Sequence, residues 1–309
     1  MGLHGRLRFN GLFERARPLT VEDKRPIHSS VPAPTPTTAN LVANSGLPDF
    51  ARPPVDEVVL SVEFAPIAGF SAPHFGLYWE RIRSIYPRLE TKPPISSPGD
   101  PLAAPPTQLS LSLLAAPEVR CWFLEERGTY LIQLQNDRFL QNWRKVEGTE
   151  VYPRYPVLRE RFERDWTSLL GFLKDEGLGQ PRVQQCEVLY VNNIEYEKGW
   201  SGYGELDKVV ATITTPSHKG RFLPAPERAS MQMTYALEND AGRLFVTLTP
   251  IIRSRDNAEV LQIRISARGA PKSSDVRDVL DWLDLGRKWV VRGFADFTTD
   301  NMHKIWGKK

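Results

Sequence analysis

The sequence predicts an α+β fold in which a broad, curved antiparallel sheet packs on long amphipathic helices. Short segments of alternating apolar and polar residues recur along the chain, and this period of two is typical of half-buried strands. Two long segments, 156–174 and 273–304, instead carry apolar residues at helical spacing. The apolar stripe of a long helix must be buried, and the apolar face of a broad sheet is large enough to cover it.

The composition is that of a globular protein. Of 309 residues, 41% are hydrophobic and 25% are charged, and the formal net charge is only +3. We therefore expect neither wholesale disorder nor binding to nucleic acid or membrane by charge alone. No stretch approaches the roughly 18 consecutive apolar residues that a membrane-spanning helix needs. Cys121 and Cys186 lie in apolar, strand-like segments, which favours reduced, packed thiols and a cytoplasmic protein.

Proline divides the chain into two parts. Eighteen of the 26 prolines fall in residues 1–117, and only eight follow. Because proline lacks a backbone N–H and fixes φ, this asymmetry predicts a loop-rich front and a regular body. We expect residues 1–52 to be a proline-rich, mostly disordered extension and residues 53–309 to be a single α+β domain. A second proline-rich stretch, 92–106, predicts a long surface loop or a flap over a site.

The first half of this domain, residues 53–177, is predicted to begin with a strand and to end with a long helix. Pro87 ends the first helix, because a residue that precedes proline disfavours the helical conformation. Pro156 in the first turn and Gly177 beyond the last turn mark the limits of the second helix. The elements expected in order are a strand at 55–64, a helix at 75–86, strands at 109–113, 121–125, 130–135 and 138–145, and the helix at 156–174.

The second half, residues 178–309, repeats this order of elements without repeating the residues. Residues 204–214 fit either a short helix or a strand, and residues 239–242 supply a hairpin turn. The other expected elements are strands at 183–196, 231–237, 244–249 and 261–267, and a final helix from 273 to about 304. We therefore infer two pseudo-repeated halves, each with the order β-α-β(3)-α.

A dense polar block in the strands at 130–135 and 138–145 predicts a binding surface. Period-two alternation gathers its amides on one face of the first strand, and amide and guanidinium groups on one face of the second. Such groups beside an aromatic ring can hydrogen-bond to a planar or anionic ligand and stack on it. The alternative is an ordinary solvated sheet face whose arginines pair with nearby acids. The candidate binding residues are Gln133, Gln135, Arg138, Asn142, Trp143 and Arg144.

Arg287 interrupts the apolar stripe of the last helix. It lies between Leu283 and Val290, where an apolar residue is expected. A charge buried there needs a partner, since an unpaired buried ion is very costly. Arg287 therefore either reaches solvent past Gly286 or binds an acid or a ligand in the interior, and we count it as a candidate ligand-binding residue.

The sequence contains no recognisable catalytic or metal-binding motif. The five histidines are scattered, and no HxxxH, HxH or CxxC occurs, so we expect no metal site and no cofactor. An enzyme would have to assemble its acid–base groups from distant segments, with Glu57, Asp137 and His303 as candidates.

A series of short blocks along the body carries a family resemblance. The blocks are PVDEVV at 54–59, QNDRF at 135–139, NWRK at 142–145, YPRY at 152–155, YVN at 190–192, MQMTY at 231–235 and WVV at 289–291, followed by Phe294, Thr298 and His303. Together they resemble a sporadically distributed family of uncharacterised bacterial proteins, over about residues 53–307. A histidine is common in that family where Arg287 stands here, which argues against a shared acid–base role at this position.

The resemblance implies a mode of inheritance and no activity. Patchy occurrence is expected of horizontally moved genes, including those of mobile defence or toxin–antitoxin loci. From the residues we expect a soluble binding or interaction protein whose polar block recognises another protein or a small ligand. One alternative is a nucleic-acid-binding protein that exposes Trp143, Arg138 and Arg144 on a curved sheet, although the near-neutral charge disfavours it. The other is a hydrolase or transferase with the assembled acid–base site.

Overall fold

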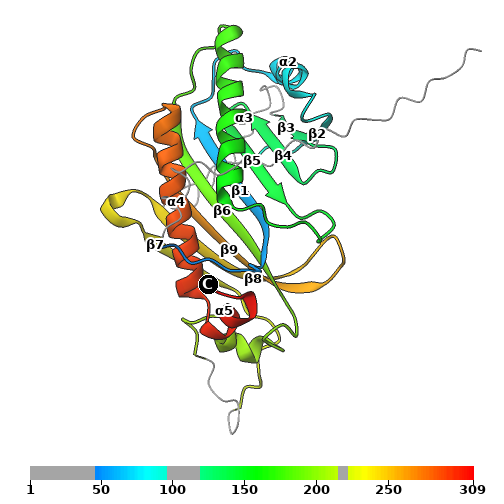
Figure 1. Ribbon diagram of the computed structural model, residues 1–309, viewed down its shortest axis with the longest axis vertical. Helices are drawn as coiled ribbons and strands as arrows, with labels where there is room; N and C mark the ends of the chain where they lie inside the picture. Colours follow the sequence, from blue (N-terminus) through cyan, green and yellow to red (C-terminus); the bar gives the residue numbers. More distant parts are fainter. Residues whose placement is uncertain (1–45, 96–118, 215–221) are drawn as a thin grey trace, which may run out of the picture. The chain divides into compact units, whose positions relative to one another are not determined.

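Nine antiparallel strands form one open sheet (Figure 1). Across the sheet their order is β2 (Arg88–Lys92), β3 (Arg120–Leu124), β4 (Tyr130–Gln135), β5 (Arg138–Arg144), β1 (Val55–Phe64), β6 (Val183–Glu195), β9 (Glu259–Gly269), β8 (Arg243–Ile252) and β7 (Met231–Ala236). The computed structural model describes residues 46–95, 119–214 and 222–309. Its helices are α2 (Ala72–Ile82), α3 (Tyr155–Asp175), α4 (Val276–Phe297) and α5 (Asp300–Trp306), with short 3₁₀ helices η1 (Tyr203–Lys208) and η2 (Glu238–Asp240). The predicted α+β fold with a broad antiparallel sheet is confirmed.

The two central strands, β1 and β6, each begin one half of the fold. From β1 the chain passes through α2 to the edge strand β2, returns strand by strand to β5 beside β1, and continues into α3. From β6 it passes through η1 to the opposite edge strand β7, returns through β8 to β9 beside β6, and continues into α4. Both halves therefore follow the same path, with four returning strands in the first and the predicted three in the second.

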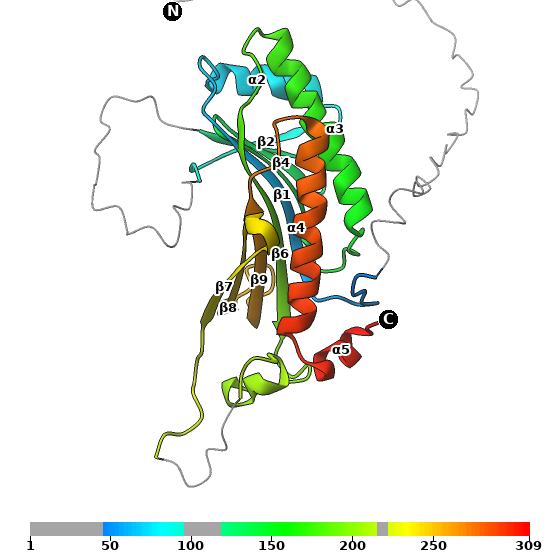
Figure 2. The same ribbon diagram turned by 90° about the vertical axis from the view of Figure 1, so that its left-hand side faces the viewer.

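Both long helices lie on the same face of the sheet (Figure 2). α3 packs against β5 and β1, and α4 packs against β6 and β9, so each helix covers the inner strands of its own half. The packing is dense and aromatic: the ring of Phe139 lies 5.8 Å from that of Phe162 and 5.5 Å from that of Trp166. Within the described part of the chain, no helix covers the other face of the sheet (Figure 2), which we call the open face.

The strand β2 was not predicted. Its sequence, Arg-Leu-Glu-Thr-Lys, lacks a repeated apolar position, and it gains its conformation from antiparallel pairing with β3. Tertiary contact thus outweighs local propensity at this edge. The predicted strand at 109–113 and most of the proline-rich loop lie outside the described residues.

The predicted final helix is two helices. α4 ends at Phe297 because Thr298 adopts an extended conformation, and Thr299 then caps α5 by accepting a hydrogen bond from the backbone of Met302. At this break Thr298 forms an isolated antiparallel bridge with Val210, just after η1. Within the stretch 204–214, a 3₁₀ helix and this single bridge replace the predicted helix or strand.

Residues 46–52 do not fit the predicted disordered extension. Phe50 is only 5% exposed, and its ring packs against the rings of Phe294, His303 and Trp306. The backbone beside it pairs with the end of the chain, with Phe50 bridging Lys308. The sequence around Phe50 has no apolar period, so this contact between the two ends of the folded part was not visible to pattern analysis. Residues 1–45 lie outside the described part.

We expect Phe50→Ala to lower the free energy of unfolding by about 3 kcal/mol or more, because it removes a buried ring and leaves a cavity. Phe222, which is 99% exposed, provides the matched control: Phe222→Ala should change stability by less than about 0.5 kcal/mol. Urea unfolding of both variants measures the difference. Equal, small effects would show that residues 46–52 are not part of the core.

Candidate functional site

The open face is hollowed over six neighbouring strands, from β3 to β9. The hollow has a volume of about 340 Å³, and its charged lining is more basic than acidic. It contains the five arginines Arg120, Arg138, Arg144, Arg264 and Arg268 and the three glutamates Glu57, Glu63 and Glu187. The five arginines outnumber the three glutamates, so the lining of the hollow has an excess of positive charge.

Strand register explains why these residues meet. Glu57 of β1 pairs with Arg144 of β5, and Glu63 pairs with Arg138 at the other end of the same ladder. Because alternate residues share a face, the polar positions of each strand line up across the sheet, while the residues between them enter the helix-covered core. Leu140 and Val59 are apolar residues among them and lie in the floor of the hollow.

Four of the predicted binding residues line the hollow: Gln133, Arg138, Asn142 and Arg144. Gln135 shares their face, but its amide is engaged by the chain itself. Its Oε1 accepts from the backbone N–H of Ile95 at 2.9 Å, and its Nε2 donates to the carbonyl of Ile95 at 3.1 Å. With 1% of its surface exposed, Gln135 positions a neighbouring segment.

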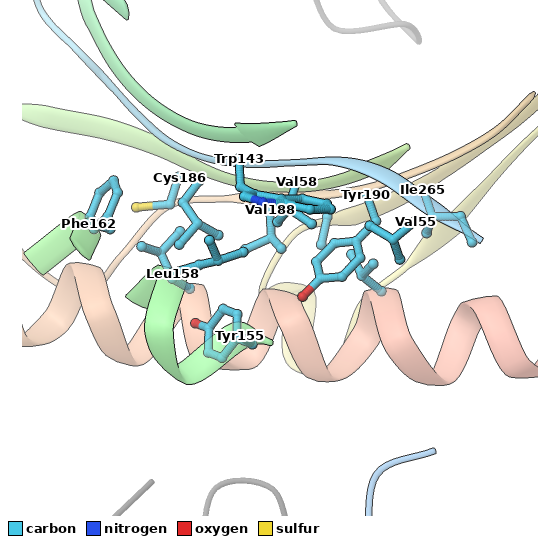
Figure 3. Close-up of a cluster of buried hydrophobic side chains, with 14 of the residues drawn as sticks. Val55, Val58, Trp143, Tyr155, Leu158, Phe162, Cys186, Val188, Tyr190 and Ile265 are labelled. Carbon is cyan, nitrogen blue, oxygen red and sulfur yellow. The ribbon is translucent and has the colours of Figure 1, made fainter. Parts of the chain in front are cut away.

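The prediction that Trp143 belongs to the polar binding surface is wrong. Trp143 is 1% exposed and lies on the helix-covered side of β5, as Figure 3 shows. Its ring packs 5.5 Å from that of Tyr152. The period-two rule itself requires this, because Trp143 is adjacent to both Asn142 and Arg144. The nucleic-acid hypothesis that used an exposed Trp143 loses that residue.

Arg287 lies away from the open face. It projects from α4 on the helix-covered side, where its guanidinium stacks 4.9 Å from the ring centre of Tyr155. The structure therefore does not bring Arg287 together with the residues of the hollow. Its side chain is half-buried and has no acid partner among the described residues, so both predicted alternatives, reach to solvent and binding of an interior ligand, stay predictions.

A chain of side-chain hydrogen bonds crosses four strands on the floor of the hollow. Arg120 donates to the Oε1 of Gln133 at 3.0 Å, the Nε2 of Gln133 donates to Asn142 at 2.9 Å, and Asn142 donates to Glu57 at 2.6 Å. Because an amide has one donating and one accepting end, the cation at one end and the carboxylate at the other fix both amide orientations. The floor is therefore rigid and satisfied by its own bonds.

Two of the five arginines are paired with acids. Arg138 lies 3.2 Å from Asp137 and 3.7 Å from Glu63, and Arg268 donates to Glu187 at 2.9 Å. The solvated-face alternative predicted such pairs, and it describes this part of the hollow.

The other three arginines, Arg120, Arg144 and Arg264, have no ion pair with a carboxylate among the described residues. Arg264 is exposed, and Arg144 and Arg120 stack on the ring of Trp122 at 5.1 and 5.6 Å. The Nε of Arg120 and the indole N–H of Trp122 are buried with no hydrogen-bond partner in the described structure. Burial also lowers the pKa of Arg120, with a further contribution from the charge of Arg138.

Glu57 is the most perturbed acid of the hollow. Burial raises the pKa of its carboxyl, although the hydrogen bond from Asn142 and the charges of Arg144 and Arg264 act in the opposite direction. The pKa of Glu57 stays raised because burial disfavours the carboxylate more than Asn142, Arg144 and Arg264 together favour it.

The proposed acid–base combination is not assembled. Glu57 lies opposite Arg144, whereas Asp137 precedes Arg138 at the far end of β5, which separates the two acids by roughly 20 Å at about 3.3 Å per residue. His303 is buried elsewhere, with its Nε2 2.9 Å from the hydroxyl of Thr298 and its ring against Phe50. Direct proton exchange between Glu57 and Asp137 is excluded by this distance.

Neither cysteine contributes a reactive group. Cys121 and Cys186 are buried and unpaired, and burial raises the pKa of both thiols. Over residues 46–95, 119–214 and 222–309, there is no cluster of three or more metal-ligating side chains. None of the helices in these ranges is both long enough and apolar enough to cross a membrane.

Sequence reasoning missed Trp122, Arg120 and Arg264. A usable signal was present, since Trp122 alternates with Cys121 and Phe123, which places its ring on the polar side of β3. Likewise Arg264 alternates with two isoleucines in β9. What the pattern could not show is that β3 and β9, at opposite sides of β1, border one hollow.

Comparisons of the chain with protein-family models, with curated proteins and with solved structures yield no match. The resemblance to a family of uncharacterised bacterial proteins therefore stays a prediction, and the site must be interpreted from its own chemistry.

Replacing Glu57 with glutamine is expected to remove one pH dependence of stability. Because the pKa of Glu57 is higher in the folded than in the unfolded protein, its protonation stabilises the fold below the unfolded pKa of about 4.3. This contribution is lost as pH rises through the folded pKa. Relative to Glu57→Gln, the wild-type protein should thus lose free energy of unfolding over this interval, as measured by urea denaturation from about pH 4 to pH 7.

Glu90→Gln is the control with the opposite sign. Hydrogen bonding from Lys92 lowers the pKa of the Glu90 carboxyl, so the wild-type advantage over this variant should be present above about pH 4.3 and lost as pH falls. A pH-independent difference between the wild type and Glu57→Gln would contradict the burial of Glu57.

Proposed function

We propose that this protein is a binding protein and that the hollow on its open face holds a small ligand with a phosphate or carboxylate group. The observation that carries the proposal is the presence at the hollow of arginines without an acid partner and of two buried N–H groups without an acceptor. Arg120, Arg144 and Arg264 lack a carboxylate partner among the described residues, and an N–H group of Arg120 and one of Trp122 lack any acceptor there.

The energetics favour an anionic ligand. A buried donor left without a partner costs about 1–3 kcal/mol, and an oxyanion recovers that cost by accepting the bond. Guanidinium groups suit this task because their planar N–H groups match the geometry of carboxylate and phosphate oxygens. An uncharged ligand would leave the excess of arginines over glutamates in the hollow uncompensated.

The amides play a supporting part in this proposal. Gln133 and Asn142 satisfy one another and their neighbours, so they hold the floor rigid, and Glu57 prevents the hollow from becoming a uniformly positive surface. A pre-ordered floor lowers the entropy cost of binding, because fewer side chains must be fixed when the ligand arrives. In this proposal the arginines and Trp122 make the contacts with the ligand.

Native mass spectrometry of protein purified from its source cell tests this proposal. We expect the wild type to carry a bound small molecule, and Arg264→Met and Arg144→Met to lose most of it. Arg277→Met is the control, since this arginine is 91% exposed on α4, on the other side of the sheet. Retention of the molecule by both hollow variants, or a wild type that binds neither a cellular molecule nor added pyrophosphate at millimolar concentration, would refute the proposal.

Nucleic-acid binding is the second candidate, favoured by one observation. The basic residues of the hollow continue to the edge of the sheet, because Lys92 of β2 pairs with Arg120 and lies 4.9 Å from the ring of Trp122. Arg88 shares this face of β2. Such a row of cations can bind along a phosphate backbone. Trp122 would supply the aromatic ring on this face, because Trp143 is buried on the other one. A position in a mobile defence or toxin–antitoxin locus stays a prediction from family resemblance.

Gel-shift titration of a short DNA duplex and of a single strand at two salt concentrations distinguishes this candidate. If phosphates are bound, affinity should fall at least about tenfold between roughly 50 and 200 mM salt, and Arg88→Met with Lys92→Met should flatten that dependence. Arg277→Met should leave both affinity and salt dependence unchanged. No retardation at the lower salt concentration would exclude nucleic acid as the ligand.

A further inference from the structure

A second hollow lies on the helix-covered side of the sheet, around three tyrosines. Its volume is about 380 Å³, and we call it the tyrosine pocket. Tyr152 comes from the loop before α3, Tyr155 from the first turn of α3, Tyr190 and Asn192 from β6, and Arg287 from α4. Pockets of this size, with mostly apolar walls and few polar groups, are typical of small-molecule sites.

Three cations line this pocket, Arg154, Arg287 and Lys309, and among them only Arg287 has no acid partner in the described structure. The nearest acid along the helix is Asp284, one turn earlier, but its carboxylate accepts from the hydroxyl of Tyr155 at 2.7 Å and from Arg159 at 3.0 Å. Arg287 is left with the ring of Tyr155, and it lies close enough to the hydroxyl of Tyr190 for its charge to oppose the rise in the Tyr190 pKa that burial causes. Its Nε is buried without a hydrogen-bond partner among the described residues.

The tyrosine hydroxyls supply a second donor. The hydroxyls of Tyr152 and Tyr190 lie 2.9 Å apart and share one hydrogen bond. Two hydroxyls carry two protons, and one bond uses only one of them, so the other proton can be donated to a third group. Figure 3 shows Tyr190 reaching from the sheet towards the helices, where Arg287 lies.

The walls of the tyrosine pocket favour a ligand with a flat, apolar ring. The rings of Tyr152, Tyr155 and Phe294 and the side chain of Val290 line the pocket. Aromatic walls favour an aromatic guest through edge and face contacts. The guanidinium of Arg287 and one tyrosine hydroxyl match the two oxygens and the single charge of a carboxylate.

The outer wall includes residues 47–50, and the two cations beside it, Arg154 and Lys309, share one carboxylate, that of Asp49. Asp49 accepts from Arg154 at 2.9 Å and from Lys309 at 2.8 Å, and Arg154 also donates to the carbonyl of Phe50. Arg154 holds these contacts with a φ of 75°, a conformation uncommon for residues other than glycine. These groups shape the pocket and leave Arg287 as the cation available to a ligand.

We propose that the tyrosine pocket binds a small aromatic carboxylate, with its carboxylate between Arg287 and the hydroxyls of Tyr152 and Tyr190 and its ring against Tyr155 and Phe294. This site lies across the sheet from the hollow of the open face and does not depend on the function proposed there.

Calorimetric titration of the full chain with benzoate and 2-naphthoate, and with the neutral amides benzamide and 2-naphthamide, tests the proposal. The wild type should bind at least one carboxylate at least about tenfold more tightly than its amide, because the neutral amide lacks the charge that pairs with Arg287. Arg287→Met should reduce carboxylate affinity to that of the amide. Arg277→Met, on an exposed position of the same helix, should bind as the wild type does.

Tyr190→Phe separates loss of binding from loss of folding, because it removes a single hydroxyl from a packed ring. It should lower carboxylate affinity severalfold with a thermal unfolding curve close to that of the wild type. The proposal is wrong if the wild type binds neither carboxylate at millimolar concentration, if the amides bind equally well, or if Arg287→Met binds as tightly as the wild type. Retention of an open-face ligand by Arg287→Met in native mass spectrometry would show that the two sites bind their ligands independently.

Discussion

The antiparallel pairing of β1 with β6 is the contact on which the rest of the structure depends. It joins the first strand of one half to the first strand of the other, with a register that runs from Val55 opposite Asn192 to Phe64 opposite Val183. Because β5 adds to the free edge of β1 and β9 to that of β6, each half grows outward from this pair. Two halves of a few strands each thereby share one sheet broad enough to bury both long helices.

This shared sheet gives the protein two chemically different faces. Val58, Trp143 and Tyr190 point into the helix-covered layer, whereas their neighbours Glu57, Asn142 and Leu189 line the open hollow. Since successive residues of a strand point to opposite faces, the same backbone serves both. A displacement of β5 by one residue would exchange the two sets, so register specifies the core and the polar face together.

The two hollows are therefore adjacent through the thickness of one sheet. On the open face the polar groups form a chain in which Arg120 and Glu57 lie at opposite ends, and Arg264 is the exposed arginine beside it. On the covered face, Arg287 stacks on Tyr155 and contacts Tyr190, among apolar walls. The first arrangement suits a highly charged ligand near water, and the second suits a weakly charged ligand that can be largely desolvated.

The sequence alone determined the fold class, most strands and both long helices, because their periods of two and 3.6 are local properties of the chain. It also determined which side chains of each strand share a face, and the same rule assigns Trp143 to the helix-covered face. Only the tertiary structure decided that Phe50 packs against Trp306 and that Trp122 and Arg264 border one hollow. It also decided that Asp284 pairs with Arg159 and not with Arg287. Strand order and partner choice depend on contacts between segments far apart in the chain, and no local period encodes them.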